Sequence, residues 1–397
     1  MFAAADLEIN MTETQLDAYG GAPDLAATAT FREIRQQPEV WLEAAALVEE
    51  QRAEVDVFLA PLLVQDELRI VFTGAGTSAF AGGIVAPTIA RATGRRVESI
   101  ATTDIVSNPA HFLAEDIPTL LVSFARSGNS PESIAATHLA DQLLSEVSHL
   151  IITCNAEGAL AREHLEKPDS LVVLMPPRSH DAGFAMTSSF TAMTLSALLI
   201  FLGDSAPTVA ALSEAAAVLI EKDWAAVEAL AQASIHRLVY LGSGPLAALA
   251  QESALKLLEL TAGAIVSYHD SSLGFRHGPK AVLDDATLAV VFISNDPYTR
   301  SYDLDILAEL RSSLGSARVL CVSTEGSAGE GGIVLPTLSG IDEGYLALAY
   351  VLVAQILALS SALRVGTTPD NPFPGGDVNR VVQGVQIHDF GGQAFER

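Results

Sequence analysis

Short apolar runs alternate with amphipathic stretches along most of the chain. Residues 69–73 and 120–124 are mainly apolar and show no alternation of polar positions, which is typical of strands covered on both faces. Each run ends in glycine and hydroxyl residues and is followed by a stretch with helical spacing. This alternation predicts an α/β fold in which each sheet is doubly wound, mostly parallel and flanked by helices.

The same pattern occurs twice. A shift of 168 residues superimposes three pairs of segments, namely 69–76 on 237–244, 119–124 on 287–292 and 150–154 on 318–322. A fourth strand is expected at 171–175, with its counterpart at 333–335. Three strands in one register indicate two copies of one unit, so the predicted architecture is two tandem α/β domains.

The remaining segments predict how these domains are joined. Thr30 and Glu33 suggest a capping box, and apolar residues from Trp41 to Leu59 follow at helical spacing, whereas residues 1–19 look loose. The expected organisation is an N-terminal helical arm (1–62), a first domain (63–206), a linker helix (207–233), a second domain (234–365) and a C-terminal tail that closes the site (366–397).

Composition narrows the possible partners and the compartment. The 397 residues include 22 basic and 48 acidic ones, and the net charge of −26 argues against binding to nucleic acid or to an anionic membrane. Cys154 and Cys321 fit neither a disulfide framework nor a metal-binding spacing. The N-terminus has no basic stretch before an apolar core, as a signal peptide would. We therefore expect a cytoplasmic protein.

One apolar segment is long enough to raise the question of a membrane span. Residues 346–363 are almost wholly apolar, but Gln355, Ser360 and Ser361 interrupt them and no basic cluster flanks them closely. A helix buried in the core or in a dimer interface is the favoured interpretation.

The loop after the strand at 119–124 has the chemistry of an anion site. Ser130 is placed as a helix N-cap, with Pro131 at the first helical position. The free N–H groups of that helix start and the hydroxyls of Ser127, Ser130 and Ser133 could together hold an anion the size of phosphate. An ordinary turn with a helix cap is the alternative interpretation.

A second glycine-containing turn, at 74–78, would lie at the same edge of the sheet. Its Gly-x-Gly pattern alone is weak evidence for a dinucleotide, because no acidic residue follows at the required distance. Thr77 and Ser78 are better interpreted as further hydroxyls that face a phosphate.

The second copy has lost the serines of the first, since residues 294–298 replace the loop at 126–130. It carries reactive side chains instead. Lys256 and Glu259 lie three residues apart on one predicted helix, where they could form a surface ion pair or part of a site. His277 lies in a glycine- and proline-containing loop that suits a proton-transfer group, with a structural role as the alternative.

Two other site classes are not supported by spacing. His269, Asp270, His277 and His388 lack the pattern of a specific metal site. Neither Ser78 nor Ser127 stands in a Gly-x-Ser-x-Gly elbow. No metal and no cofactor are therefore predicted.

Taken together, the motifs resemble those of the double sugar-isomerase (SIS) family. Within it they are most similar to the galactosamine-6-phosphate deaminase/isomerases, which are also labelled tagatose-6-phosphate ketose/aldose isomerases. The likeness covers nearly the whole chain, and the segments that carry it are 74–78, 127–130, 183–189, 252–259, 277–279 and 378–385.

The resemblance implies roles by comparison with a broader relative, the isomerase half of glucosamine-6-phosphate synthase. Glu259 matches its proton-shuttling base, His277 its ring-opening histidine and Lys256 a lysine of its site. Ala125 and Gln383 depart from it, standing where the synthase has a serine and a lysine. The substrate- and phosphate-binding residues expected from the motifs are Gly76, Thr77, Ser78, Arg126, Ser127, Gly128, Asn129, Ser130, Thr187, Ser188, Asn379 and Arg380.

The resemblance also implies an activity. Ring opening followed by proton transfer from C2 to C1 would convert galactosamine 6-phosphate into tagatose 6-phosphate and ammonia. About 65 residues precede the first strand, too few for a glutaminase domain, so the ammonia-releasing direction is expected. Alternatives are a phosphosugar isomerase without deamination, a glucosamine-6-phosphate deaminase and a non-catalytic sensor, which the lack of a DNA-binding arm disfavours. A homodimer or larger homo-oligomer is expected, with sites at the interface and His277 reaching across.

Overall fold

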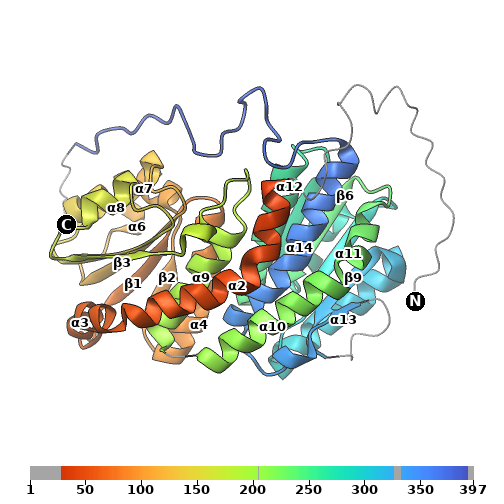
Figure 1. Cartoon of the computed structure of the whole chain (residues 1–397), viewed down its shortest axis with the longest axis horizontal. Helices are drawn as coiled ribbons and strands as arrows, with labels where there is room; N and C mark the ends of the chain where they lie inside the picture. Colours follow the sequence, from red (N-terminus) through yellow and green to blue (C-terminus); the bar gives the residue numbers. More distant parts are fainter. Residues whose placement is uncertain (1–27, 204, 326–331, 392–397) are drawn as a thin grey trace.

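The computed structural model describes residues 28–203, 205–325 and 332–391, so the expectation for residues 1–19 lies outside the described part. Two five-stranded sheets form its centre, and all neighbouring strands are parallel. In sheet order, the strands of the first sheet are β2 (Arg96–Ser99), β1 (Arg69–Thr73), β3 (Thr119–Ala125), β4 (Val147–Thr153) and β5 (Ser170–Leu174). Those of the second sheet are β7 (Val266–Ser271), β6 (Arg237–Gly242), β8 (Thr287–Phe292), β9 (Val319–Ser323) and β10 (Gly332–Val334). The identical strand order confirms the predicted tandem α/β fold (Figure 1).

Helices lie on both faces of each sheet. Those of the first unit are α4 (Thr77–Thr93), α5 (Thr102–Ser107), α6 (Pro109–Phe112), α7 (Pro131–Leu143), α8 (Ala159–His164) and α9 (Ser188–Leu202). Those of the second are α12 (Pro245–Leu260), α13 (Pro297–Leu314) and α14 (Glu343–Val365). Preceding and joining them are α2 (Ala29–Glu50), α3 (Arg52–Leu63), α10 (Ala206–Lys222) and α11 (Trp224–Ala231).

Alternate residues of the central strands enter different apolar clusters, as expected for sheets covered on both sides. Ile70 of β1 belongs to a large cluster that also contains Leu238 of β6, so the two units share one core. The neighbouring Val71 faces a separate cluster beneath α7, and Val239 faces another on the far side of the second sheet.

The internal repeat holds for two strands and shifts by two residues at the third. Arg69 pairs with Thr119 and Arg237 with Thr287, in agreement with the 168-residue offset. The third offset was wrong, because Val122 pairs with Leu150 whereas Val290 pairs with Leu320. Two additional residues therefore lie between β8 and β9. An even shift keeps the same side chains on the same face of the sheet, which is why the sequence pattern concealed it.

Two edge strands, β2 and β7, were not predicted. Both are partly or fully exposed along their length, and Val266 at the start of β7 retains 54% of its accessible surface. Because an edge strand is less covered than a central one, it lacks the continuous apolar run that identified β1, β3, β6 and β8.

The apolar segment in the last third of the chain forms α14, which packs against α12, α11, α10 and α9. It is long and apolar enough to cross a membrane, but 94% of its most apolar window is buried within the molecule. A buried core helix passes the same length and composition test, so this helix is weak evidence for a membrane span. The predicted burial of the segment is confirmed.

The predicted capping box at the start of α2 was wrong. The N-cap is Thr28, whose hydroxyl accepts a hydrogen bond from the Phe31 N–H at 3.2 Å. Thr30 instead donates its hydroxyl to Asp370, and Glu33 accepts hydrogen bonds from backbone N–H groups near residue 182. Partners distant in sequence have replaced the local ones.

The C-terminal segment from residue 366 to 391 contains no α-helix or strand. From the end of α14 it passes across the top of the molecule toward α7 and α8 (Figure 1). Asp370 lies at the start of α2, Arg380 lies at the carboxyl end of β3, and Phe390 packs near α7. The segment therefore spans both units.

Candidate active site

A pocket of about 110 Å³ opens at the carboxyl end of β3, between the loop 126–130 and the start of α4. The polar side chains that line it belong to Ser78, Arg126, Ser127, Ser130, Ser133 and Arg380. The structure thus brings together hydroxyls from both turns singled out in the sequence and adds Arg380 from the C-terminal segment. Ala125, the position where a serine was missing, also lies in the wall.

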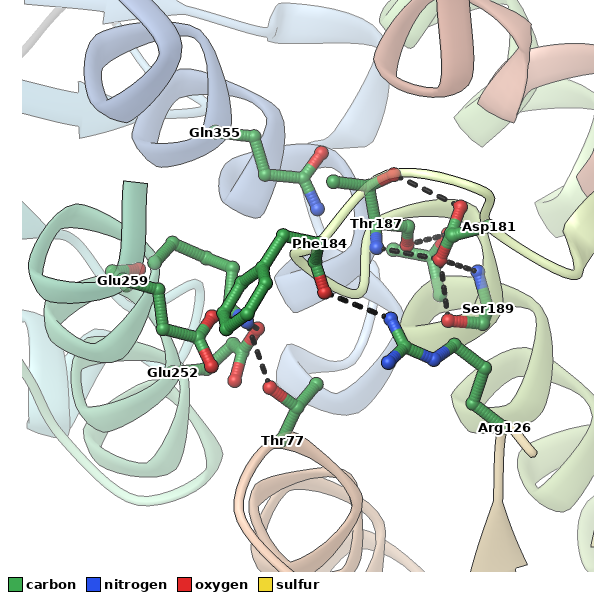
Figure 2. Close-up of polar contacts among 12 residues, drawn as sticks. Thr77, Arg126, Asp181, Phe184, Thr187, Ser189, Glu252, Glu259 and Gln355 are labelled. Atoms are coloured by element: carbon green, nitrogen blue, oxygen red, sulfur yellow. Dashed lines mark hydrogen bonds and ion pairs between the residues drawn. The ribbon is translucent and has the colours of Figure 1, made fainter. Parts of the chain in front are cut away.

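Arg126 is the most unusual group in this pocket. It is 7% exposed and donates to the carbonyl oxygen of Phe184 at 3.0 Å (Figure 2). It also donates to the carbonyl oxygen of Arg380 at 2.9 Å. It forms no ion pair within the described part of the chain. Burial and the charge of Arg380 lower the pKa of this guanidinium. A buried cation that forms no ion pair, beside several hydroxyls, favours an anionic ligand.

A second loop holds the 126–130 loop in place. The side-chain amide of Asn155 donates to the carbonyl of Ser127 at 2.8 Å, and the backbone of Leu160 donates to the carbonyl of Gly128 at 2.9 Å. Asn129 contributes its side-chain oxygen to the Ala159 N–H, so this side chain supports the loop. Gly128 has a φ of 65°, a left-handed conformation that favours glycine.

Replacing Gly158 with alanine tests that support. The added Cβ would lie 2.6 Å from the Ser127 carbonyl oxygen and 3.0 Å from the Gly128 Cα. We expect Gly158→Ala to lower the free energy of unfolding by about 1–3 kcal/mol and to weaken phosphate binding, as measured by urea denaturation and calorimetry. Unchanged phosphate affinity would show that the anion does not depend on this loop.

Ser127 and Ser130 also make contacts within the loop. Ser127 accepts a hydrogen bond from the Asn129 N–H at 3.3 Å, and Ser130 donates to the Glu132 carboxylate at 2.7 Å. Ser130 is the N-cap of α7 as predicted, but its hydroxyl does not cap a helical N–H. The N–H groups of the helix start thus receive no side-chain cap.

In the second copy a carboxylate of the chain itself accepts hydrogen bonds from the equivalent loop. Glu343, at the start of α14, accepts hydrogen bonds from the Ser294 hydroxyl at 2.6 Å and the Asp296 N–H at 3.1 Å. The side chain of Asp296 caps α13 by accepting from the Thr299 N–H. An internal anion thus occupies the second loop, which supports the expectation that only the first copy binds an external one.

Three ionisable groups of α12 form a cluster beside the start of α4. Lys256 is 1% exposed and donates to the Glu259 carboxylate at 2.5 Å and to the Thr77 hydroxyl at 2.9 Å. Its ammonium lies 3.5 Å from Glu252. The alternative of a surface ion pair is therefore wrong. Because Thr77 precedes Ser78, one helix start connects this cluster to the anion pocket.

The sequence interpretation did not include Glu252 among the site residues. Its side chain is fully buried, and burial followed by repulsion from Glu259 raises its pKa to about 8, although Lys256 opposes this shift. The signal that could have identified it is its spacing, since Glu252 and Lys256 are four residues apart on one helical face. The raised pKa favours the uncharged form of Glu252, and the shorter contact of Lys256 is with Glu259.

This carboxyl group should make stability depend on pH. Because the pKa of Glu252 is higher in the folded chain than its ordinary 4.5, the folded state retains a proton that the unfolded state releases. Its stabilising contribution is present below pH 4.5 and lost as the pH rises through 8, by at most about 1.4 kcal/mol per pH unit. We expect Glu252→Gln to flatten this slope in urea denaturation between pH 5.5 and 8.5. An equally steep slope in the variant would contradict the assignment.

Thr187 and Ser188, which were expected to bind the substrate, do not line the anion pocket. Both are fully buried at the start of α9, where their N–H groups donate to Asp181. The hydroxyl of Thr187 donates to Asp181 and that of Ser188 to the carbonyl of Glu33. These contacts hold the loop that precedes α9.

His277 and Asn379 are both exposed. His277 lies between two short 3₁₀ helices, η3 (Gly274–Arg276) and η4 (Pro279–Val282), and its ring makes no hydrogen bond within the described residues. Asn379 donates its amide to the Gly376 carbonyl. Among the described residues, neither a hydrogen bond nor an ion pair joins His277 to Glu259.

Gly76 does have the conformation that its turn requires. As N-cap of α4 it has φ 54° and ψ −125°, and Gly244, its counterpart before α12, has φ 57° and ψ −129°.

Within the described ranges no group of three or more acidic, histidine or cysteine side chains could hold a metal ion.

Comparisons with known proteins agree with the tandem α/β fold. The SIS domain model matches residues 62–203 and 230–364. A Streptomyces coelicolor relative is 56% identical over 373 residues, covering 92% of this chain and 97% of its own, and is provisionally named D-galactosamine-6-phosphate deaminase AgaS. An Escherichia coli protein of that name is 46% identical, with 93% and 98% covered.

A solved structure shows the same fold. The crystal structure of tagatose-6-phosphate ketose/aldose isomerase from Escherichia coli has a TM-score of 0.84 and 43% identity, and covers 92% of this chain and 98% of its own. Similarity of this extent, together with two matched domains in tandem, establishes the family. This chain belongs to the SIS domain family.

Proposed function

We propose that the chain is an isomerising deaminase of an amino-sugar 6-phosphate, with galactosamine 6-phosphate as substrate and tagatose 6-phosphate and ammonia as products. The observation that carries this proposal is Arg126, a buried cation without an ion pair, in a pocket lined by serine hydroxyls. Glu259 is linked to the start of α4, which also borders this pocket, because Lys256 donates hydrogen bonds to both Glu259 and Thr77. Relatives at 46% and 56% identity carry the corresponding name.

The proposed reaction divides the work between the two copies. The first copy binds phosphate through Ser78, Arg126 and the 126–130 loop, so that binding energy from the phosphate orients the reacting carbons. His277 assists ring opening. The Glu259 carboxylate then removes the proton from C2 and returns it to C1, which converts the open-chain 2-amino aldose into a ketose imine. Water adds to C2 of the imine, the carbon–nitrogen bond breaks, and ammonia leaves.

Lys256 supports this role of Glu259 by holding it in place. Its ammonium donates a hydrogen bond to the Glu259 carboxylate and fixes that side chain beside the start of α4. Burial raises the pKa of Glu252 to about 8, which favours the uncharged form of this second carboxyl group beside the pair.

Two parallel assays test the proposed activity. Ammonia release is measured with galactosamine 6-phosphate and glucosamine 6-phosphate, and aldose/ketose conversion is measured with tagatose 6-phosphate. We expect ammonia release to be fastest with galactosamine 6-phosphate. Conversion of tagatose 6-phosphate without any ammonia release would favour the second candidate, a plain isomerase, which is the activity named for the similar Escherichia coli structure.

The exposed position of His277 is consistent with a proposed homodimer in which this residue acts in the partner's site. Mixing Glu259→Gln and His277→Ala chains under exchange conditions tests the arrangement. If His277 acts across the interface, a mixed dimer contains one intact site, and an equal mixture should recover about a quarter of wild-type activity. If it acts within its own chain, no activity returns. Sedimentation of an active enzyme as a monomer would also contradict the proposal.

A further inference from the structure

Three carboxylates from distant parts of the chain meet around one short turn, residues 182–184. Glu33 of α2 accepts hydrogen bonds from the Ala182 N–H at 2.5 Å and the Gly183 N–H at 3.2 Å. Asp370 of the C-terminal segment accepts from the Ala29 N–H at 2.7 Å and the Thr30 N–H at 2.9 Å. Asp181, directly before the turn, accepts from the first residues of α9.

The packing around Gly183 shows how closely these groups approach. A Cβ at this position would lie 2.8 Å from a Glu33 carboxylate oxygen, 2.8 Å from the Thr30 hydroxyl and 3.4 Å from an Asp370 oxygen. Burial and repulsion from Asp181 and Asp370 raise the pKa of Glu33 to about 7. This shift agrees with the convergence of three carboxylates in a largely buried space.

The turn leads directly to the anion pocket. Phe184, its last residue, provides one of the two carbonyls that accept from Arg126, and Arg380 provides the other. Figure 2 shows the Phe184 carbonyl directed at Arg126, with Asp181 beside the same loop. Arg380 lies in the segment that begins at α14 and passes Asp370 at the start of α2. Both carbonyls that hold Arg126 therefore belong to segments anchored at the start of α2.

We propose that Glu33 is a positioning residue of the anion pocket, which together with Asp370 sets the orientation of Arg126 from outside the pocket. This inference rests on the proposed phosphate site but not on the identity of the sugar. Glu33 acts through the 182–184 turn, and Asp370 acts through the C-terminal segment. Neither residue contacts the ligand, so both affect affinity more than the chemical step.

Glu33→Ala and Glu33→Gln test the proposal in the full-length protein. Inorganic phosphate binding is measured by calorimetry, KM and kcat with galactosamine 6-phosphate, and thermal unfolding by circular dichroism. We expect Glu33→Ala to raise KM and the phosphate Kd by roughly tenfold while kcat stays within about twofold. Glu33→Gln keeps one acceptor oxygen and should restore much of the loss. Glu50→Gln, an exposed change on the same helix, is the matched control and should leave KM, the phosphate Kd and kcat unchanged.

Asp370→Asn provides a second route should Glu33→Ala unfold, because Asp370 lies outside the helix and is only partly buried. Like Glu33→Ala, it should raise both KM and the phosphate Kd. Unchanged phosphate affinity in both folded variants, or a fall in kcat with KM constant, would overturn the inference. If wild-type protein binds phosphate and the variants bind it more weakly, but no amino-sugar phosphate is deaminated, the positioning role stands and the proposed function fails. If wild-type protein binds no phosphate, both fail.

Discussion

Glu259→Gln is expected to reduce kcat by about 10²- to 10⁴-fold, the usual contribution of a general base. The amide cannot accept the C2 proton, but it has nearly the shape of the carboxylate and still accepts a hydrogen bond from Lys256. KM should therefore change little. The measurement is steady-state ammonia release, combined with exchange of the C2 hydrogen with solvent, which should fall in parallel because it reports the same proton transfer.

Glu221→Gln, an exposed change near the end of α10, is the matched control and should leave both rates unchanged. If Glu259→Gln retains wild-type turnover, the base must be another group. Glu252 would then be the first candidate, because it is the other carboxyl group close to Lys256.

Arg126→Met is expected to raise KM for the phosphosugar by roughly 10- to 100-fold, since a hydrogen bond to a charged group contributes about 1.5–3 kcal/mol. The chemical step should be less affected, because Arg126 lies in the loop after β3 whereas Glu259 and Lys256 lie on α12. Stability should change by less than about 2 kcal/mol, since removing an unpaired buried charge offsets the loss of two hydrogen bonds to carbonyl groups. Phosphate titration and urea denaturation measure the two effects separately.

Arg162→Met is the control for Arg126, because it removes an exposed guanidinium from α8 of the same unit. It also tests whether general attraction of the anion, rather than the pocket, controls KM. The chain carries a net charge of −26, so its overall field repels a phosphate ester. An equal rise in KM for both variants would show that Arg126 has no specific role.

Divergence of the two copies explains how one repeated fold can present groups for phosphate binding in one copy and for proton transfer in the other. Both copies keep the glycine turn with nearly the same backbone angles. Both also begin the helix after the third strand in sheet order, α7 or α13, with a proline. In the first copy the loop after β3 presents hydroxyls and Arg126. In the second copy Glu343 occupies the corresponding loop, and α12 presents Lys256 and Glu259 instead.

Much of the fold could be predicted because its signals are local. Central strands are covered on both faces and therefore consist of continuous apolar runs, which also revealed the repeat. Edge strands β2 and β7 were missed because exposure permits polar residues at most of their positions. The two-residue shift before β9 went unnoticed because residues on the same face of a strand recur with a period of two.

The candidate site could be predicted only in part. Ser127 and Ser130 form the expected loop after β3, since the loop and the helix start are contiguous in sequence. Thr187 and Ser188 were expected to bind the ligand, but their groups donate hydrogen bonds to Asp181 and to the carbonyl of Glu33. Which acceptor a hydroxyl or N–H group finds depends on the polar groups that become its neighbours after folding.

The sequence by itself determined the tandem α/β architecture, the glycine turns and the residue types available for phosphate binding and proton transfer. All of these depend on residues near one another in the chain. Only the tertiary structure decided that Lys256 is buried, that burial raises the pKa of Glu252, and that Asp370 reaches a helix start 340 residues away. Burial and charge interactions depend on distance in space, and folding brings together groups whose sequence separation gives no sign of that proximity.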